Sequence, residues 1–182
     1  MFQISNTKSF NKDRLTRVNE EKYPYVTRTS INNGVWGYTG FVNSENINSA
    51  KTFSLGLLQM DFFYQKEAWY AGQFVRKIIP KFEINDILAL YFSGILNKQK
   101  SLLLSVLVRE VDDTFNNIEI NLPVYNTGNI AFDYMEAYIK ELEAERIKAL
   151  ETYLQATGLN SYVLSDEERQ LVESFRKNGG GD

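Results

Sequence analysis

The residues of this 182-residue sequence that could do chemistry are basic and amide side chains gathered in a few polar segments. Lysine and arginine suit contacts to phosphate, whereas asparagine, glutamine and arginine suit the paired hydrogen bonds that read adenine and guanine edges in the major groove of DNA. The candidate phosphate contacts are Lys8, Lys12 and Arg14. The candidate reading residues are Arg28, Ser30, Asn32, Asn33, Gln73 and Arg76. Polar turns of this composition are common, and residue type alone favours a ligand-binding or protein-binding module over a DNA reader.

Charge is divided unevenly along the chain, whose net charge is −3 and whose pI is about 5.2. Residues 1–128 hold 14 Lys and Arg against 12 Asp and Glu, whereas residues 129–182 hold 6 against 11. An acidic chain lacks the overall basic signature of a free-standing nucleic-acid binder. The first 28 residues nevertheless form a locally basic segment. Such a segment suits either a contact with DNA or a surface that only faces solvent.

The sequence offers little material for catalysis. It contains no cysteine and no histidine, which excludes disulfides, cysteine and Ser-His nucleophiles and the ordinary zinc sites. It also lacks a phosphate-binding loop and a dinucleotide-binding glycine motif. The carboxylates Asp112, Asp113 and Glu119 suggest a magnesium-dependent nuclease, but Asn121 stands where that site needs a lysine. We therefore expect a non-catalytic protein that holds neither a metal nor a cofactor.

An α+β globule must position these side chains. Strand-like runs occur at 2–5, at 23–27, around Trp36 and twice within 52–65, and Asn33-Gly34 is a strong turn signal. The alternation at 118–122 predicts a last strand, while residues 82–108 look mainly helical, with 102–108 ambiguous. Together they predict a twisted mixed β-sheet with packed helices. Four aromatics are expected in the core rather than as base-stacking platforms: Tyr25, Trp36, Tyr64 and Trp69.

One long amphipathic helix is predicted over residues 131–157, ending at Gly158. At about 1.5 Å per residue it is roughly 40 Å long, so part of it needs another helix to cover its apolar side. The apolar spacing of about 3.7 residues per turn is nearer that of a straight helix than the 3.5-residue period of a left-handed coiled coil, so we expect a short, coiled-coil-like pair with a partner helix. The expected dimer interface is Met135, Ile139, Leu142, Ile147, Leu150 and Leu154.

Three regions are expected: a globular domain at 1–128, a dimerisation helix at 129–158, and a short helix with a disordered tail at 159–182. Ser165 and Glu168 form a capping box for that short helix. The chain has no apolar run long enough to span a membrane and no signal peptide, so we expect a cytoplasmic protein without a membrane partner.

Several ordered blocks of the sequence resemble one known family, the target recognition domain of type I restriction-modification specificity subunits, including BcgI-like specificity subunits. The first is PYVTRTSINNG at 24–34. The others are FQIS with KSFNKDRLT at 2–16, FFYQ at 62–65, WYAGQ at 69–73, INLPV with GNIAFDYMEAYIKELE at 120–143, and TGLNSYVLSDEE at 157–168.

The resemblance implies a domain that reads half of a bipartite double-stranded DNA site. It also implies long helices that pack antiparallel, set the spacing between two readers and dock a methyltransferase (modification) subunit. That partner would bind S-adenosylmethionine, and a restriction subunit is a further candidate partner. With one recognition domain and one helix where the family usually has two of each, the chain looks like a half subunit that acts as a homodimer on a palindromic site.

Two departures from the family pattern stand out. Met1 falls inside the stretch that usually opens the domain, so the first strand is expected to be short. The acidic segment VDDTFNN at 111–117 replaces basic or glycine-rich residues and argues against DNA contact there. Two alternatives stay open: a decoy that captures the modification subunit without reading DNA, and a fragment that works only with another half subunit.

Overall fold

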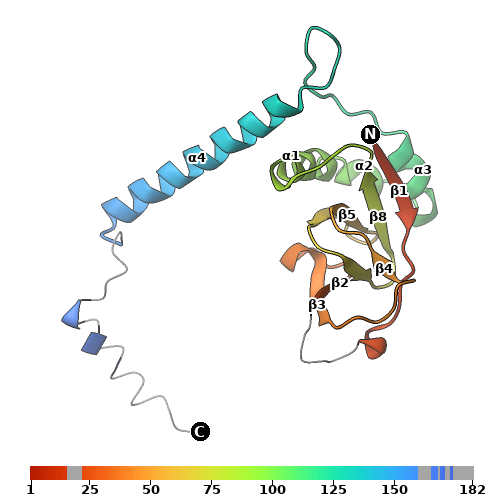
Figure 1. Cartoon of the computed structure of the whole chain (residues 1–182), viewed down its shortest axis with the longest axis horizontal. Coiled ribbons are helices and arrows are strands. Elements are labelled where there is room, and N and C mark those ends of the chain that lie inside the picture. Colours follow the sequence, from red (N-terminus) through yellow and green to blue (C-terminus); the bar gives the residue numbers. More distant parts are fainter. Residues whose placement is uncertain (16–21, 160–164, 168, 171–172, 174–182) are drawn as a thin grey trace. The chain divides into compact units, whose positions relative to one another are not determined.

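Strands dominate the first half of the chain and helices the second half (Figure 1). The computed structural model describes residues 1–15, 22–159, 165–167, 169, 170 and 173. The strands are β1 (Phe2–Asn6), β2 (Tyr23–Val26), β3 (Val35–Thr39), β4 (Ile47–Asn48), β5 (Thr52–Gly56), β6 (Asp61–Gln65), β7 (Trp69–Ala71) and β8 (Val75–Pro80). The helices are α1 (Asp86–Asn97), α2 (Lys100–Leu104), α3 (Val111–Asn116) and α4 (Phe132–Ala156), with 3-10 turns η1 (Lys12–Arg14), η2 (Asn32–Gly34) and η3 (Val108–Glu110).

The first sheet has the order β1-β8-β5-β6, with every neighbouring pair antiparallel. β5 lies inside this sheet and is buried at all five positions. The two strand-like runs predicted within 52–65 are confirmed as the hairpin β5–β6. Its turn includes Met60 in a left-handed conformation, with φ of 54°.

The second sheet has the order β3-β2-β7-β4, and only its β2–β7 pair is parallel. The predicted strand, turn and strand around Asn33-Gly34 are confirmed as the hairpin β2–β3. The prediction of a single mixed sheet is wrong, because the strands divide between two sheets. Sequence patterns mark strands locally, but pairs such as β1 with β8 join segments that lie far apart in the chain.

The main core lies between the first sheet and the helices α1, α2 and α3. Its fully buried large side chains are Phe53, Leu55, Phe62, Ile78, Phe92, Leu103 and Met135. Smaller clusters belong to the second sheet, one including Val26 and Trp69 and one formed by Phe10, Tyr25 and Tyr70. Each buried aliphatic or aromatic side chain contributes about 1.5–3 kcal/mol of gross burial, so the first sheet and its helices carry most of the stability.

Helix α1 closes one edge of the first sheet. It begins at Asn85, whose side chain accepts a hydrogen bond from the Leu88 N–H at 2.9 Å, as an N-cap residue should. Near its other end, the Asn97 side chain bonds both the N–H and the carbonyl of Phe62, at 3.0 and 2.9 Å. β6 is an edge strand, whose free backbone groups could otherwise pair with a strand of another molecule. The bonds from Asn97 satisfy two of these groups.

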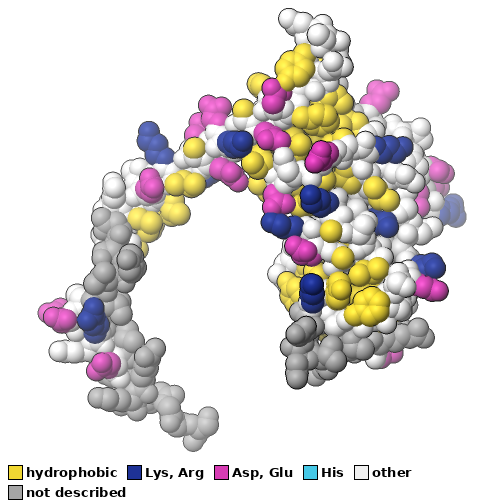
Figure 2. All heavy atoms as spheres, in the orientation of Figure 1, with side chains coloured by type: hydrophobic (Ala, Val, Ile, Leu, Met, Phe, Trp, Pro, Cys, Tyr) yellow, Lys and Arg dark blue, Asp and Glu magenta, His cyan; other side chains and the backbone are white. Residues whose placement is uncertain are grey.

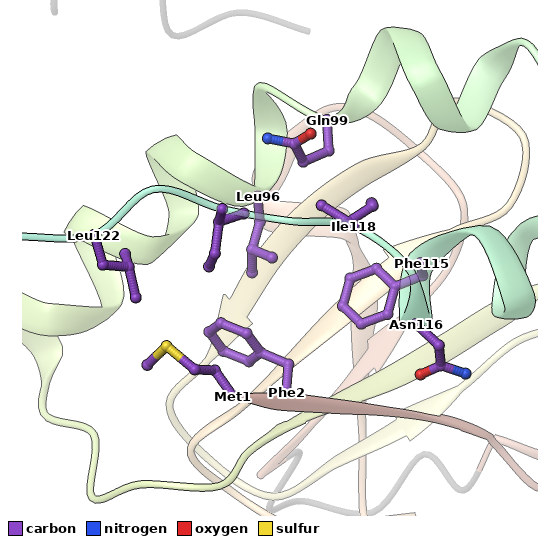
Figure 3. Close-up of a pocket in the computed structure, with 9 residues that line it drawn as sticks. Met1, Phe2, Leu96, Gln99, Phe115, Asn116, Ile118 and Leu122 are labelled. Carbon is purple, nitrogen blue, oxygen red and sulfur yellow. The ribbon is translucent and has the colours of Figure 1, made fainter. Parts of the chain in front are cut away.

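The segment after α3 departs from the prediction of a last strand over 118–122. It is extended but pairs with no strand among the described residues, apart from an isolated bridge between Val124 and Ile130. Its alternating apolar side chains pack on the main core instead, and with Phe2 and Leu96 they line a cavity of about 230 Å³ (Figure 3). The ambiguous stretch 102–108 is helical up to Leu104.

Helix α4 confirms the long helix predicted over 131–157. Beyond it, Gly158 has a φ of 72°, the left-handed conformation that glycine adopts without strain. The N–H groups of Gly158 and Leu159 bond the carbonyls of Gln155 and Leu154, at 3.3 and 2.9 Å. This is the Schellman arrangement that ends helices.

The chain forms two compact units, Met1–Ile139 and Lys140–Asp182. The first turns of α4 belong to the first unit: the Phe132 ring stacks on Phe82, with centroids 5.1 Å apart, and Met135 is fully buried. The assignment of Met135 to a dimer interface is therefore wrong, since the core of its own chain covers it. The predicted domain limits at residues 128 and 158 stay predictions.

Two further predictions fall mostly outside the described residues. Around the short helix predicted after Ser165, residues 166, 167, 169, 170 and 173 are helical, but Glu168 of the capping box is not described. The predicted disordered tail also lies beyond the described part. Among the described helices, none combines enough length with enough apolar character to span a lipid bilayer.

Candidate nucleic-acid interface

A groove of about 350 Å³ lies where three segments distant in sequence come together, and we call it the polar groove. The segments are the loop after β1, the end of β2 with the residues that follow it, and the turn between β7 and β8. The lining residues are Asn11, Lys12, Tyr25, Thr27, Arg28, Thr29, Gly72 and Gln73. The structure thus brings together the predicted residues Lys12, Arg28 and Gln73, with no carboxylate among these lining side chains.

Main-chain hydrogen bonds fix the three segments to one another and to the sheets. They run from the Phe10 N–H to the Ala71 carbonyl (3.2 Å), from the Gly72 N–H to the Val26 carbonyl (2.8 Å) and from the Leu57 N–H to the Phe74 carbonyl (2.9 Å). These main-chain bonds do not involve the side chains of Asn11, Lys12, Arg28 or Gln73, which line the polar groove.

Each cation of the polar groove lies over an aromatic ring. The Lys12 ammonium is 3.9 Å from the centroid of the Trp36 ring, and the Arg28 guanidinium carbon is 5.3 Å from that of Phe74. Trp36 and Phe74 are 52% and 53% exposed. Both distances are within the range of cation–π attraction, which holds a positive charge at the surface without neutralising it. The cations therefore remain available to an anionic partner.

The amide pair of Asn11 and Gln73 joins two sides of the polar groove. The Gln73 amide nitrogen Nε2 donates a hydrogen bond to Asn11 Oδ1 at 3.1 Å. Both residues are exposed at the groove surface.

The backbone near Arg28 and Phe74 is closely constrained. A Cβ atom on Gly56 would lie 2.9 Å from the Arg28 Cα, so only glycine permits the loop to cross β5 at this distance. Phe74 has a φ of 59°, which is unusual for a bulky residue. Such conformations persist only where the surroundings impose them, and here they fix the wall of the polar groove.

Tyr25 lines the polar groove and also holds the loop after β1 in place. Its hydroxyl donates a hydrogen bond to the Phe10 carbonyl at 2.6 Å. Burial, and secondarily the negative charge of Asp13, raises the pKa of Tyr25 above its ordinary value of 10.0. The neutral phenol is therefore the form that anchors the loop after β1.

The structure gives Asn32 and Asn33 structural roles that their residue type did not reveal. Both have positive φ, and the Ile31 carbonyl accepts a bond from the Gly34 N–H, as in a type I′ turn. The Asn32 amide donates to the Val35 carbonyl at 2.9 Å, and the Asn33 amide donates to the Tyr64 carbonyl of β6 at 2.9 Å. Asn33 therefore ties the hairpin of the second sheet to the first sheet.

Three other predicted site residues, Lys8, Ser30 and Arg76, are not among the lining residues, and the side chain of Arg14 lies outside the described part of the structure. Ser30 is exposed, and Lys8 forms a weak surface ion pair with Glu45 at 3.8 Å. Arg76 bonds both carboxylate oxygens of Asp112 through Nε, at 2.9 and 3.1 Å, and its side chain is only 21% exposed. We therefore place Arg76 outside the reading surface. Arg14 ends the η1 turn, next to the groove segment.

Sequence reasoning placed the loop 8–17 and the turn 27–34 in the candidate DNA surface but named neither Asn11 nor Thr29 as a contact. It missed Trp36 and Phe74 as rings that hold cations. Trp36 was expected in the core, with Tyr25, Tyr64 and Trp69, of which Tyr25 and Trp69 are indeed buried. The sequence carried one signal that Trp36 is exposed. Successive residues of a strand face opposite sides of the sheet, so the residue after buried Val35 faces outward.

The second surface of interest is the apolar side of α4 beyond Ile139. Leu142, Ile147 and Leu150 are 38%, 58% and 57% exposed. Apolar side chains follow one side of this helix and charged side chains the other (Figure 2).

The family model for the type I restriction modification DNA specificity domain matches residues 1–152. No curated protein matches the chain.

The solved structures that are similar to this chain include two specificity subunits. The HsdS subunit from Thermoanaerobacter tengcongensis has a TM-score of 0.54 and 10% identity, covering 84% of this chain and 37% of that one. The S subunit of the type I restriction-modification system from M. genitalium has a TM-score of 0.45 and 15% identity, covering 87% and 40%. The likeness to the first is one of fold alone, and this chain spans only 37–40% of the length of either subunit.

Proposed function

Because this chain belongs to the type I restriction modification DNA specificity domain family, we propose that its polar groove reads one half of a bipartite DNA target in the major groove. Membership of this family supports a role in DNA sequence recognition within a restriction-modification system, without catalysis by this chain.

One observation carries the proposal: the polar groove collects Lys12, Arg28 and Gln73 from three segments distant in sequence. A DNA reader needs cations for phosphates and amide or guanidinium groups for base edges. The groove supplies both on a frame of main-chain hydrogen bonds. A positive surface without a lining carboxylate also suits an anionic duplex better than a neutral ligand.

The second part of the proposal concerns α4. Its exposed apolar residues, together with Ile139 and Leu154, would pack antiparallel against a second copy of the chain. From Lys140 to the end of α4 the helix rises about 25 Å, long enough for several layers of side-chain contacts. The two readers would then be related by a two-fold axis, and their target would be palindromic and bipartite.

The third part concerns partners. We propose that the paired helices position a methyltransferase (modification) subunit, which would bind S-adenosylmethionine, while this chain holds no cofactor. A restriction subunit would join the same complex.

The test is DNA binding by the purified full chain, alone and with the modification subunit. Both samples are titrated with a duplex carrying the bipartite target and with a scrambled duplex, at several salt concentrations, because nonspecific affinity depends steeply on salt. We expect the complex to prefer the target by about a thousandfold or more. Tight assembly with the modification subunit but no sequence preference at any salt concentration would reject DNA reading and favour the decoy.

A further inference from the structure

The hydrogen bond between Asn11 and Gln73 engages only part of the Gln73 amide. The bond uses one of the two N–H groups on Nε2, donated to Asn11 Oδ1 at 3.1 Å. No other hydrogen bond from the described residues reaches the Gln73 amide, which keeps its Oε1 acceptor and its second N–H donor. An acceptor beside a donor is what a carboxamide needs to bond N6 and N7 of adenine in the major groove.

The two residues occupy anchored positions. Asn11 directly follows Phe10, which is buried and bonded through its backbone to Ala71 and Tyr25. Gln73 directly follows Gly72, whose N–H bonds the Val26 carbonyl. The side chains therefore start from fixed backbone, and the bond between them restricts the rotamers of Gln73. A glutamine restricted in this way loses less conformational entropy when it binds a base than a free one does.

The flanking charges suit the same partner. Lys12 and Arg28 line the polar groove with this amide pair, and each lies over an exposed aromatic ring. Contacts from these cations to phosphates would set the register of the duplex, so that one base edge faces the amide pair.

We infer that Gln73 reads an adenine of the target, and that Asn11 is a positioning residue that acts through Gln73. The inference rests on the proposed function, namely that the polar groove binds duplex DNA. It assigns the amide pair to one A·T base pair in each half of the target.

The test is selection of bound sequences from a duplex library with randomised half-sites, using the full chain with its modification subunit. The variants are Gln73→Ala, Asn11→Ala, Asn11→Asp and the double variant with alanine at both positions. We expect the wild-type chain to select adenine at one position, and Gln73→Ala to weaken that preference by about tenfold or more, the discrimination typical of a bidentate contact.

Asn11→Ala should weaken the preference at the same position by a smaller factor. The double variant should match Gln73→Ala alone, because Asn11 has no effect without Gln73. Asn11→Asp keeps an oxygen that accepts the Gln73 N–H, so it should retain the adenine preference while its added negative charge lowers affinity for all sequences.

Matched controls are Gln59→Ala and Asn126→Ala, which remove exposed amides outside the polar groove. Neither should change any preference, and thermal unfolding of every variant checks that it is folded. A wild-type complex that selects no sequence would reject the proposed function and this inference with it. Selection that Gln73→Ala leaves unchanged, or that Asn11→Ala alters at a different position, would reject the inference alone.

Discussion

Lys12 and Trp36 show how a single residue pair prepares a surface for an anion. The indole ring gives the lysine a preferred position, yet leaves its charge free to meet a phosphate. We therefore predict that Trp36→Leu weakens duplex DNA binding by about two- to fivefold, equivalent to about 0.5–1 kcal/mol. Lys12→Ala should also reduce the slope of log affinity against log salt concentration by about 0.9, whereas Trp36→Leu should change the slope less.

Fluorescence anisotropy titrations at several salt concentrations measure both quantities. Phe41→Leu is the matched control, because Phe41 is an exposed aromatic residue outside the polar groove. Equal loss of affinity in Phe41→Leu and Trp36→Leu would contradict a specific role for the lysine–indole contact.

Asn33 gives the second prediction at this scale. Asn33→Ala removes the bond to the Tyr64 carbonyl and places alanine in a left-handed conformation, at a total cost of about 2 kcal/mol. Asn33→Gly removes the same bond but tolerates the conformation, so its cost should be about 1 kcal/mol. Urea unfolding compares the two variants, and equal stability of Asn33→Ala and the wild type would refute the proposed tie between the sheets.

Residue type predicted part of the site and could not predict the rest. It identified Lys12, Arg28 and Gln73 as candidate DNA contacts, and the fold brings them together. It treated Asn32 and Asn33 in the same way, although their amides bond backbone carbonyls. An amide bonds a base edge or a carbonyl equally well, so the tertiary neighbours decide between the two.

At the scale of elements, sequence periodicity predicted the helices and hairpins whose formation depends on residues close together in the chain. The hairpin β2–β3, the hairpin β5–β6 and helix α4 follow from turn signals, alternation and helical spacing. The division into two sheets does not, because it depends on pairing between distant strands. The stretch 118–122 shows the limit of alternation: its apolar side faces the core, although no described strand pairs with it.

Helix α4 yields the prediction that belongs to this scale. Leu150→Asp should leave the first unit folded but raise the dimer dissociation constant on the order of a hundredfold or more, because a carboxylate would be buried in each copy. Thr152→Asp places the same charge on the other side of the helix and should leave the dimer intact. Sedimentation velocity compares the two, and unchanged dimers in Leu150→Asp would reject α4 as the interface.

At the scale of the whole molecule, the two-fold pairing proposed above dictates the form of the target. Two identical readers related by a two-fold axis bind two inverted copies of one half-site. We predict that methylation mapping of DNA from cells carrying this chain and its modification subunit shows a palindromic motif interrupted by a spacer. A non-palindromic motif would reject the homodimer and favour pairing with a different half subunit.

The main-chain bonds that frame the polar groove affect how the sequence of such a chain can evolve. Because the bonds of Phe10, Gly72 and Leu57 need no particular side chain at positions 11, 12, 28 or 73, those four positions can be exchanged without refolding the domain. If the polar groove reads DNA as proposed, new combinations at these positions would change the sequence that the chain recognises without altering its fold. The side chains proposed to contact DNA can thus be changed separately from the bonds that hold the fold. The polar groove is therefore a suitable place to engineer a new DNA specificity.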